Sequence, residues 1–319
     1  MTTITTKRHK LKFYLSIVFS FLFFCGFGTF MIWIFISGLN RGEFVEAKYY
    51  FMPVFGLLFY IMAFYTIVKY FRNVPIISID KDLIKFGSAE IYNLTDIQNV
   101  VLTGKKPFKF IFKYPMEGTE ILLKNGTTKY FFDDMYSNAW ELKLFLEQVV
   151  IKKKDFAYIE NYRIDPSELR YEQISYFKGN QFTSLRGFSC WGIIVFFIYL
   201  MISRDKIPPV GALILIGSIG TVLFVFNSWL MNFFGLSEEY FIIKNHNFIW
   251  KENIYRLTDI KEVIFETRVK MPNCLRIVTK DYRNKLYPAA TLRDKTWLEL
   301  KRVLEKEGIK VRNECIYHC

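Results

Sequence analysis

The decapeptide IYNLTDIQNV, residues 91–100, is followed 163 residues later by IYRLTDIKEV, residues 254–263, and seven of the ten positions are identical. A second pair of similar stretches lies downstream, WELKLFLEQ at 140–148 and WLELKRVLEKE at 297–307. Two apolar runs precede each decapeptide. Self-similarity at a fixed separation indicates a repeated structural unit. The sequence therefore predicts a tandem duplication, in which each unit has two apolar helices, short strands and a closing helix.

The apolar runs that precede the decapeptides contain no Asp, Glu, Lys or Arg, and they cover 13–40, 49–68, 187–203 and 207–237. About 20 helical residues cross the hydrocarbon core of a bilayer, and a charge at the centre of such a helix is costly. We therefore expect four membrane-spanning helices in two hairpins. The run 187–203 is at the lower limit of length, and a re-entrant or core helix is the alternative there.

Basic residues indicate the orientation of these helices. Lys7, Arg8, Lys10 and Lys12 precede the first run, with no acidic residue among them. Because Lys and Arg are retained on the cytoplasmic side, we expect a multi-pass protein of the plasma (inner) membrane with both termini in the cytoplasm. The net charge of +13 suits a chain that lies against an anionic leaflet. No basic helix or zinc-finger spacing accompanies it, so nucleic acid is not an expected partner.

The segments that follow the apolar runs have the alternation of short strands. In the first unit, Asp80-Lys81-Asp82 and Asn125-Gly126 predict hairpin turns, and FKFIFKY (108–114) is expected as one strand with its Phe residues on one face. In the second unit, FIWKEN (248–253) is among the expected strands. Helices over roughly 136–150 and 294–307 close the units. The expected fold is α+β, with each helical hairpin followed by a small curved sheet or barrel and a C-terminal helix.

A hydrophobic spacing in both decapeptides, followed by a terminal helix, resembles that of bacterial PH-like domains attached to membrane hairpins. The residues that carry it are Ile91, Ile97 and Val100, and Ile254, Ile260 and Val263. The resemblance covers roughly 50–150 and 209–308, and it departs at Tyr92 and Tyr255, where the family often has proline. The family is defined by its fold, so the resemblance implies binding modules and neither a catalytic residue nor a cofactor.

The predicted organisation has six parts: a basic cytosolic tail (1–12), a transmembrane hairpin (13–72), a PH-like domain (73–150), a linker (151–186), a second hairpin (187–236) and a second PH-like domain (237–319). Within the linker, DPSELRYEQISYF (165–177) predicts a helix. Asp165 can cap it, Pro166 occupies its first position and Glu168 completes a capping box.

The polar centre of each decapeptide is a Thr-Asp pair, Thr95-Asp96 and Thr258-Asp259. These residues either contact a ligand in both units or bond to nearby backbone groups in a turn while their apolar neighbours enter the core. We favour the turn, because Thr and Asp oxygens commonly accept hydrogen bonds from adjacent backbone N–H groups.

Two proline-containing basic loops follow the decapeptides at matching distances, GKKPFKF (104–110) and RVKMPNC (268–274). In a functional interpretation, anionic lipid head groups or a protein partner bind electrostatically to these loops. The residues involved would be Lys105, Lys106, Lys109, Arg268 and Lys270. The alternative, which we favour, is an exposed turn followed by a half-buried strand.

No metal or catalytic site is predicted. The C-terminal CIYHC offers only Cys315, His318 and Cys319, whereas a structural zinc site usually has four ligands, so an ordinary C-terminal tail is favoured. The three histidines are scattered, and no G-x-S-x-G, P-loop or H-E-x-x-H motif occurs. The five cysteines lie in expected spans or on the cytosolic side, where disulfides are rare.

The sequence therefore favours a non-enzymatic membrane scaffold or adaptor whose PH-like modules bind a protein partner or anionic lipid; self-association stays open. The alternative is an immunity protein that protects against a membrane-active toxin. A transporter or channel is disfavoured, because no charged residue or histidine lies within an expected span. The four-residue spacing of Ser16 and Ser20, and of Gly217 and Thr221, instead predicts close helix packing.

Overall fold

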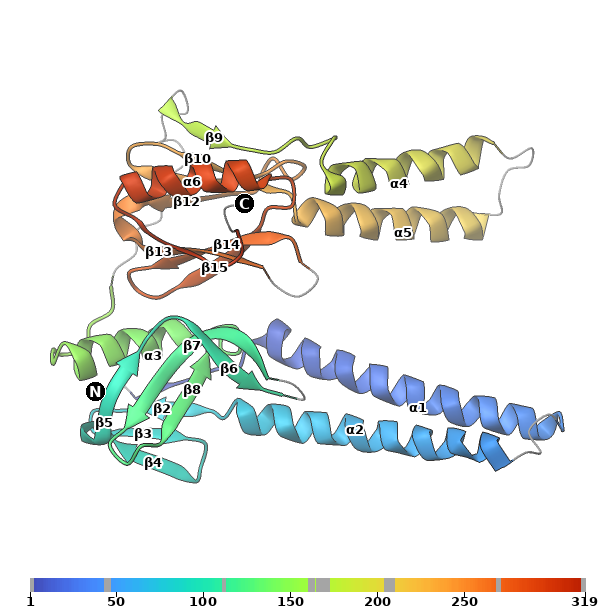
Figure 1. Cartoon of the computed structure of the whole chain (residues 1–319), viewed down its shortest axis with the longest axis horizontal. Helices are drawn as coiled ribbons and strands as arrows, with labels where there is room; N and C mark the ends of the chain where they lie inside the picture. Colours follow the sequence, from blue (N-terminus) through green and yellow to red (C-terminus); the bar gives the residue numbers. More distant parts are fainter. Residues whose placement is uncertain are drawn as a thin grey trace. The chain divides into compact units, whose positions relative to one another are not determined.

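A computed structural model of the chain describes residues 3–42, 47–110, 113–159, 164, 173–203, 210–267 and 271–316. The chain divides into two compact units, Met1–Tyr158 and Ile159–Cys319. Each unit combines a pair of apolar helices with two small sheets and a further helix (Figure 1). The fold is therefore α+β, as expected. In the described part of the chain the sheets do not close into a barrel, so only the open-sheet form of the prediction holds.

The helix pair of unit 1 consists of α1 (Ser16–Asn40), which continues a π-helical turn at Lys10–Leu15, and α2 (Phe51–Asn73). The helices Lys10–Asn40 and Phe51–Asn73 are long and apolar enough to cross a membrane. They pack antiparallel along their length. The ring centroids of Phe13 and Tyr70 lie 5.1 Å apart near one end, and those of Phe35 and Tyr50 lie 5.3 Å apart near the other.

The helix pair of unit 2 is shorter. Within the described residues, α4 (Leu185–Ile202) and α5 (Val210–Trp229) carry apolar stretches at Leu185–Tyr199 and Leu213–Trp229. The apolar run 207–237 is not all helix, because α5 ends at Trp229 and Asn232–Leu236 forms strand β10. A continuous apolar run is compatible with either a helix or a buried strand. The boundary expected at 236 therefore lies too far along the chain.

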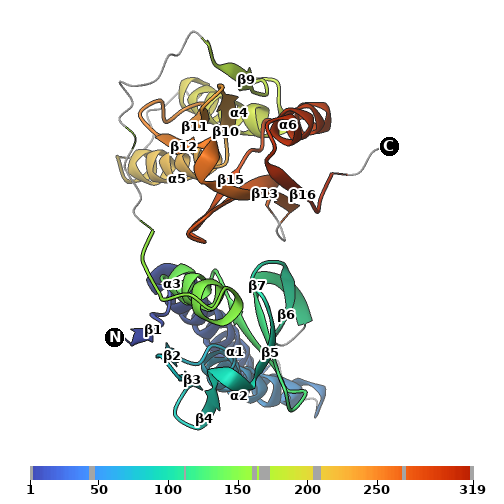
Figure 2. The ribbon, with the colours of Figure 1, turned by 90° about the vertical axis from the view of Figure 1, so that its left-hand side faces the viewer.

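The first sheet of unit 1 begins before the helix pair and resumes after it. Its strands run in the order β1 (Ile4–Thr5), β2 (Ile77–Ile79), β3 (Leu83–Phe86) and β4 (Glu90–Asn93). Ile4 pairs with Ile79, and the side chains of Ile4 and Thr6 are buried. The N-terminal segment expected as a cytosolic tail is therefore part of the folded unit. Figure 2 looks at the β-rich side, with α1 and α2 running away behind the strands.

The second sheet of unit 1 is built on the long strand β7. It contains β5 (Ile97–Val101), β6 (Lys105–Lys109), β7 (Lys113–Leu123) and β8 (Thr128–Phe132), and β7 pairs with the other three. Lys109 is the partner of Lys113, so the chain reverses between them. The prediction of a single strand over 108–114 is therefore wrong. The alternation of Phe with other residues in this stretch runs from the end of β6 into the start of β7.

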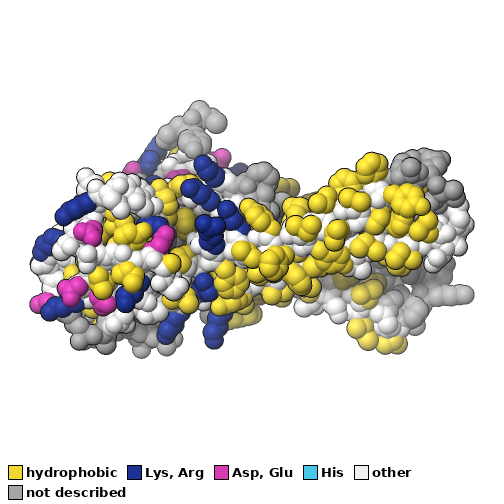
Figure 3. Space-filling model, turned by 90° about the horizontal axis from the view of Figure 1, so that it is seen from below, with side chains coloured by type: hydrophobic (Ala, Val, Ile, Leu, Met, Phe, Trp, Pro, Cys, Tyr) yellow, Lys and Arg dark blue, Asp and Glu magenta, His cyan; other side chains and the backbone are white. Residues whose placement is uncertain are grey.

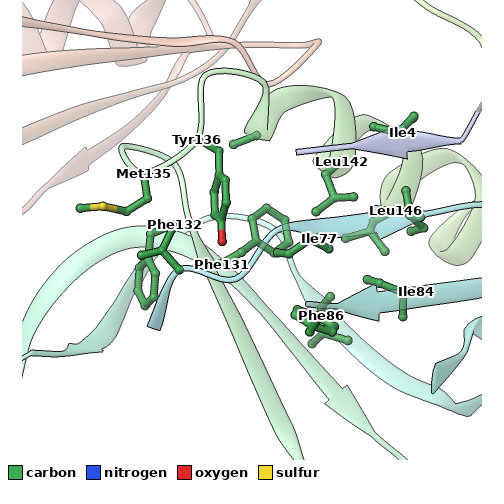
Figure 4. Packing of buried hydrophobic residues seen from close by; sticks show 14 of the residues in the cluster. Ile4, Ile77, Ile84, Phe86, Phe131, Phe132, Met135, Tyr136, Leu142 and Leu146 are labelled. Carbon is green, nitrogen blue, oxygen red and sulfur yellow. The ribbon is translucent and has the colours of Figure 1, made fainter. Parts of the chain in front are cut away.

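Helix α3 (Ala139–Phe145), extended by a π-helical turn at Leu146–Ile151, closes unit 1. Leu142 and Leu146 on this helix belong to the same buried cluster as Ile4, Ile77 and Phe131 (Figure 4). The N-terminal strand, the sheets and the closing helix thus share one hydrophobic core.

Unit 2 repeats the order of elements of unit 1 from the strand before the helix pair to the decapeptide, but its second sheet has three strands before the closing helix and one after it. Its first sheet runs β12 (Glu252–Arg256), β11 (Tyr240–Asn245), β10 and β9 (Ser175–Phe177), so a strand before the helix pair again joins a strand after it. Ser175–Phe177 was expected within a helix, which is wrong for these residues; 165–172 lies outside the described residues. Its second sheet runs β15 (Asn284–Pro288), β14 (Asn273–Thr279), β13 (Ile260–Thr267) and β16 (Lys310–Asn313), and α6 (Asp294–Lys306) precedes β16.

Both decapeptides form the transition from the first sheet to the second. Each contains a 3₁₀ turn, at Leu94–Asp96 and at Leu257–Asp259. The strand that follows this turn, β5 or β13, has a register shift near its start. The N–H of Leu94 donates to the carbonyl of Asp82 at 2.7 Å, and that of Leu257 donates to Glu239 at 2.9 Å. The two decapeptides thus specify the same local structure.

Candidate membrane-surface site

The ends of α1 and α2 are fastened to the sheets of unit 1 by the N-terminal segment. The N–H of Lys7 donates to Oδ1 of Asn138 at 2.7 Å, and Nδ2 of Asn138 donates to the carbonyl of Thr5 at 3.0 Å. The N–H of His9 donates to the carbonyl of Met135 at 2.8 Å. These bonds tie the start of the first apolar helix to the loop that precedes α3. The helix pair therefore leaves the sheets at a fixed point.

Arg8 completes this attachment at the end of α2. Its Nε donates to the carbonyl oxygen of Val74 at 2.9 Å, directly after the helix. Its guanidinium carbon lies 5.1 Å from the ring centroid of Phe13 and 4.7 Å from that of Phe71. A cation near a helix C-terminus satisfies a free carbonyl and interacts favourably with the helix dipole. Arg8 thus joins both helices to the start of the first sheet.

The β6–β7 hairpin lies beside the same helix end. The ring centroid of Tyr70 is 5.3 Å from that of Phe110 and 5.8 Å from that of the buried Phe108. The side-chain amide of Asn73 donates to the carbonyl oxygen of Lys109. Strands β5 and β6 both pair with β7, and together the three extend from 97 to 123, whereas the β13–β14 hairpin of unit 2 extends from 260 to 279. The end of the β6–β7 hairpin therefore contacts the last turns of α2.

The predicted basic residues of unit 1 lie in strand β6 and not in a loop. Lys106 is a poor candidate for a ligand, because its Nζ forms an ion pair with Glu120 at 2.6 Å and its side chain is only 12% exposed. Lys105 lies at the start of β6 and Lys109 at its end, where Lys109 is exposed opposite Lys113. Arg268 and Lys270 lie outside the described residues.

Five basic residues surround the base of the helix pair in unit 1, and we call them the basic collar: Lys10, Lys69, Arg72, Lys109 and Lys113. Lys10 lies in the first turn of the helical segment, and Lys69 and Arg72 lie in the last turns of α2. Lys109 and Lys113 flank the hairpin tip that contacts α2. None of the five forms an ion pair with another described residue. In Figure 3, Lys and Arg side chains gather where the apolar helical part meets the β-rich part.

A different set of bonds joins α5 to the sheets of unit 2. Nδ2 of Asn245 donates to the carbonyl of Ser228 at 2.8 Å, and Nδ2 of Asn247 donates to Oγ of Ser228 at 2.6 Å. Nδ2 of Asn232 donates to the carbonyl of Pro288 at 2.7 Å. The last helical carbonyls lack partners within a helix. Here the amide side chains donate hydrogen bonds to these carbonyls, so the end of α5 is also attached to the sheets.

In both Thr-Asp pairs the aspartate accepts a hydrogen bond through its backbone carbonyl, whereas we expected the Thr and Asp side-chain oxygens to accept bonds from nearby backbone N–H groups. The carbonyl oxygen of Asp96 accepts from the N–H of Lys124, and that of Asp259 accepts from Lys280, both at 2.8 Å. The Asp96 side chain accepts from Nδ2 of Asn93 at 3.2 Å. The apolar neighbours do pack into the cores: Leu94, Ile97 and Val100 in unit 1, and Leu257, Ile260 and Val263 in unit 2.

Two buried ion pairs were not predicted from the sequence. Lys143 of α3 lies 2.6 Å from Asp133, and Arg276 of β14 lies 2.7 Å from Glu266 of β13. All four side chains are 1% exposed. Burial of charges without a partner is strongly unfavourable. In each pair the cation and the carboxylate neutralise each other within one unit. No local sequence pattern distinguishes these buried charges from those on the surface.

Among the described residues, no group of three or more His, Cys, Asp or Glu side chains could hold a metal ion. Cys315 is a free thiol, and burial is the main cause that raises its pKa. The other two residues of the C-terminal trio, His318 and Cys319, lie outside the described residues.

Neither protein-family models nor curated proteins match this chain. The described structure defines an α+β chain with two helices able to cross a membrane and basic residues around the base of that helix pair.

Proposed function

We propose that the chain is a non-enzymatic, multi-pass protein of the plasma (inner) membrane that presents two cytosolic PH-like modules. In this proposal the four apolar helices span the bilayer as two hairpins, both termini are cytoplasmic, and the two units arose by duplication. Unit 1 binds anionic lipid head groups at its membrane-facing base, so that the modules are held at the surface for a protein partner.

The order of elements supports the PH-like assignment. In each unit, short strands form a first sheet, the decapeptide leads into a second sheet, and a helix comes after β8 in unit 1 and after β15 in unit 2, where the strand β16 follows it. The helix pair is inserted between the first two strands of the first sheet, β1 and β2 or β9 and β10. A module attached by both ends of its helix pair has little freedom to turn away from the membrane. Orientation and local concentration are what a membrane scaffold supplies to a partner.

The single observation that carries the lipid assignment is the position of the β6–β7 hairpin. Its tip contacts Tyr70 and Asn73 at the end of α2, and it places Lys109 and Lys113 opposite each other. Like charges in directly opposed positions destabilise a strand pair. An anionic surface removes that penalty, and each basic residue near such a surface contributes about 1 kcal/mol. Together with Lys10, Lys69 and Arg72, the hairpin provides a ring of cations at the depth of the head groups.

Lipid retention tests this assignment. The full chain, extracted in mild detergent, is incubated with equal amounts of phosphatidylglycerol and phosphatidylcholine, and retained lipid is measured by mass spectrometry. The wild type should retain phosphatidylglycerol preferentially, and Lys109→Glu with Lys113→Glu should abolish most of that preference. A matched control is Lys81→Glu with Lys124→Glu, which makes the same change of charge in the turns β2–β3 and β7–β8. An equal loss in both double variants would refute a site at the collar.

Reporter fusions test the topology. Fusions after residues 160 and 316 should report a cytoplasmic location, and a fusion at 206 should report an external one. Reversed signals would refute the proposed orientation. If the fusion at 206 also reports the cytoplasm, the second helix pair does not span the membrane. Crosslinking in native membranes, followed by identification of the captured protein, would then identify the partner.

A further inference from the structure

Two large apolar side chains occupy the tip of a turn in unit 2. Ile249 and Trp250 lie between β11 and β12, and they are 81% and 79% exposed. The N–H of Lys251 donates to the carbonyl of Phe248 at 2.8 Å and closes the turn around them. Turn centres usually carry Gly, Pro, Asn or Asp, which suit the backbone and the solvent. The local fold therefore does not explain an Ile-Trp pair, which we had expected within a strand.

The turn lies beside the junction between the helix pair and the sheets. The side-chain amide of Asn247 donates to Oγ of Ser228, in the last turn of α5, at 2.6 Å. Nε2 of Gln181, in the segment that leads into α4, donates to Oδ1 of the same Asn247 at 2.6 Å. One residue thus connects the turn to the end of α5 and to the approach to α4. Ile249 and Trp250 lie two and three residues further along the chain.

Other exposed apolar side chains lie at the same junction. Phe182, one residue after Gln181, is 60% exposed, and Leu185, the first residue of α4, is 83% exposed. A basic residue, Lys178, precedes this segment; burial first, and then the charge of Lys178, lower the pKa of His246. Aromatic side chains beside cationic ones are characteristic of the interface between hydrocarbon and water. The ring centroid of Phe182 lies 5.6 Å from that of Trp191 on α4, so this aromatic side chain packs against the helix.

The corresponding turn of unit 1 has no such side chains. Between β3 and β4 the chain reads Gly87-Ser88-Ala89, and the N–H of Gly87 donates to the carbonyl of Ile76 at 2.8 Å. In unit 1 the β6–β7 hairpin lies beside the helix pair, where Phe110 contacts Tyr70. The two units therefore share a framework but differ in the side chains of this turn.

We propose that the Ile249-Trp250 turn is an interfacial anchor, which inserts into the lipid bilayer at the boundary between head groups and acyl chains. The inference rests on the proposed membrane location. Transfer of these two side chains out of water is favourable, and Trp in particular prefers the interface. The turn thereby fixes the base of unit 2 at the membrane surface, a role for which unit 1 uses its basic collar.

Quenching of tryptophan fluorescence by brominated lipids tests this proposal with the full chain in vesicles of phosphatidylcholine and phosphatidylglycerol. The contribution of one tryptophan to the fluorescence is the difference between the emission spectrum of the wild type and that of the variant in which this tryptophan is changed to Phe. We expect the contribution of Trp250 to be blue-shifted relative to water-exposed tryptophan, and to lose more intensity with bromine near the head groups than with bromine deep in the chains. Trp33, 61% exposed on α1, serves as the membrane control, and Trp297, fully buried in the core of unit 2, serves as the protein-core control.

The three variants separate the possible outcomes. If Trp33 is quenched while the Trp250 contribution is red-shifted and unquenched, the anchor is refuted and the membrane location stands. If neither is quenched, the proposed membrane location itself fails and the anchor fails with it. If Trp297 is quenched as strongly as Trp250, the signal does not report insertion of the turn, and the anchor is refuted. Quenching of Trp33 and Trp250 with Trp297 unaffected supports the proposal.

Discussion

Gly28 and Gly56 face each other at a close contact between α1 and α2. A Cβ atom on Gly28 would lie 2.9 Å from the carbonyl oxygen of Gly56, and one on Gly56 would lie 2.7 Å from Cγ1 of Ile32. Small residues at such a contact allow helix backbones to approach within a membrane, where packing provides most of the attraction between helices.

A larger residue at this contact should force the helices of unit 1 apart. We expect Gly28→Leu to destabilise the full chain by about 1–3 kcal/mol, the usual cost of overpacking. Gly26→Leu is the matched control, because a Cβ atom on Gly26 meets no atom within 4 Å. Thermal unfolding in detergent measures both variants. Equal melting temperatures for the two would show that α1 and α2 do not pack at Gly28.

Arg8 should stabilise the attachment of the helix pair. Arg8→Ala removes the bond to Val74 and the contacts with Phe13 and Phe71, and we expect a loss of about 1–3 kcal/mol. Arg8→Lys retains a cation but not the planar guanidinium, so it should recover only part of this loss. Lys10→Ala removes the same charge from an exposed side chain and should change the unfolding temperature little. The measurement is thermal unfolding together with the rate of proteolysis between β1 and α1.

The buried pair of Lys143 and Asp133 offers a contrast with a surface pair in the same unit. Lys143→Met leaves Asp133 buried without its cation, and we expect a cost of about 3–5 kcal/mol. Lys129→Met removes a pair with Glu90 that is partly exposed, and we expect less than about 1 kcal/mol. Adding Asp133→Asn to Lys143→Met should restore much of the loss, because no unpaired charge then remains. Denaturant unfolding of the three variants in detergent checks this order; similar losses for Lys143→Met and Lys129→Met would contradict it.

Local patterns predicted much of the fold. The turns at Asp80-Lys81-Asp82 and Asn125-Gly126 are present, and Gly126 has the positive φ, 79°, that favours glycine. The closing helices are also present, as α3 and α6. These features depend on short-range preferences, which a sequence displays directly.

What the sequence did not reveal depends on contacts between distant residues. The pairing of Ile4 with Ile79 spans the whole helix pair, and a two-residue strand has no pattern of its own. Close helix packing was expected at Ser16 and Ser20 and at Gly217 and Thr221. A Cβ atom on Gly217 would meet nothing within 4 Å, whereas Gly28 and Gly56, which were not named, lie in close contact. The basic collar was only partly predicted: Lys109 was named, but Lys113 is brought beside it only by the hairpin, which no local pattern showed.

His246 should make the stability of unit 2 depend on pH. Its Nε2 lies 3.3 Å from Oγ1 of Thr291 and its ring centroid 4.7 Å from that of Phe233. Burial first, and then the charge of Lys178, lower the pKa of His246 from its ordinary value of 6.5. The unfolded chain therefore binds a proton at this residue more readily than the folded chain does. The contribution of neutral His246 to stability is complete above about pH 6.5 and is lost as the pH falls through the folded pKa.

His246→Gln should remove this part of the pH dependence, because glutamine keeps a polar group near Thr291 but does not titrate. The unfolding temperature of the wild type should fall more steeply than that of the variant between about pH 7 and about pH 5, the range in which histidine changes charge. Below that range the carboxylates titrate in both proteins, so the two curves should become parallel. The measurement is thermal unfolding at a series of pH values at constant ionic strength. Parallel curves through the whole range would show that His246 is protonated as readily in the folded chain as in the unfolded one.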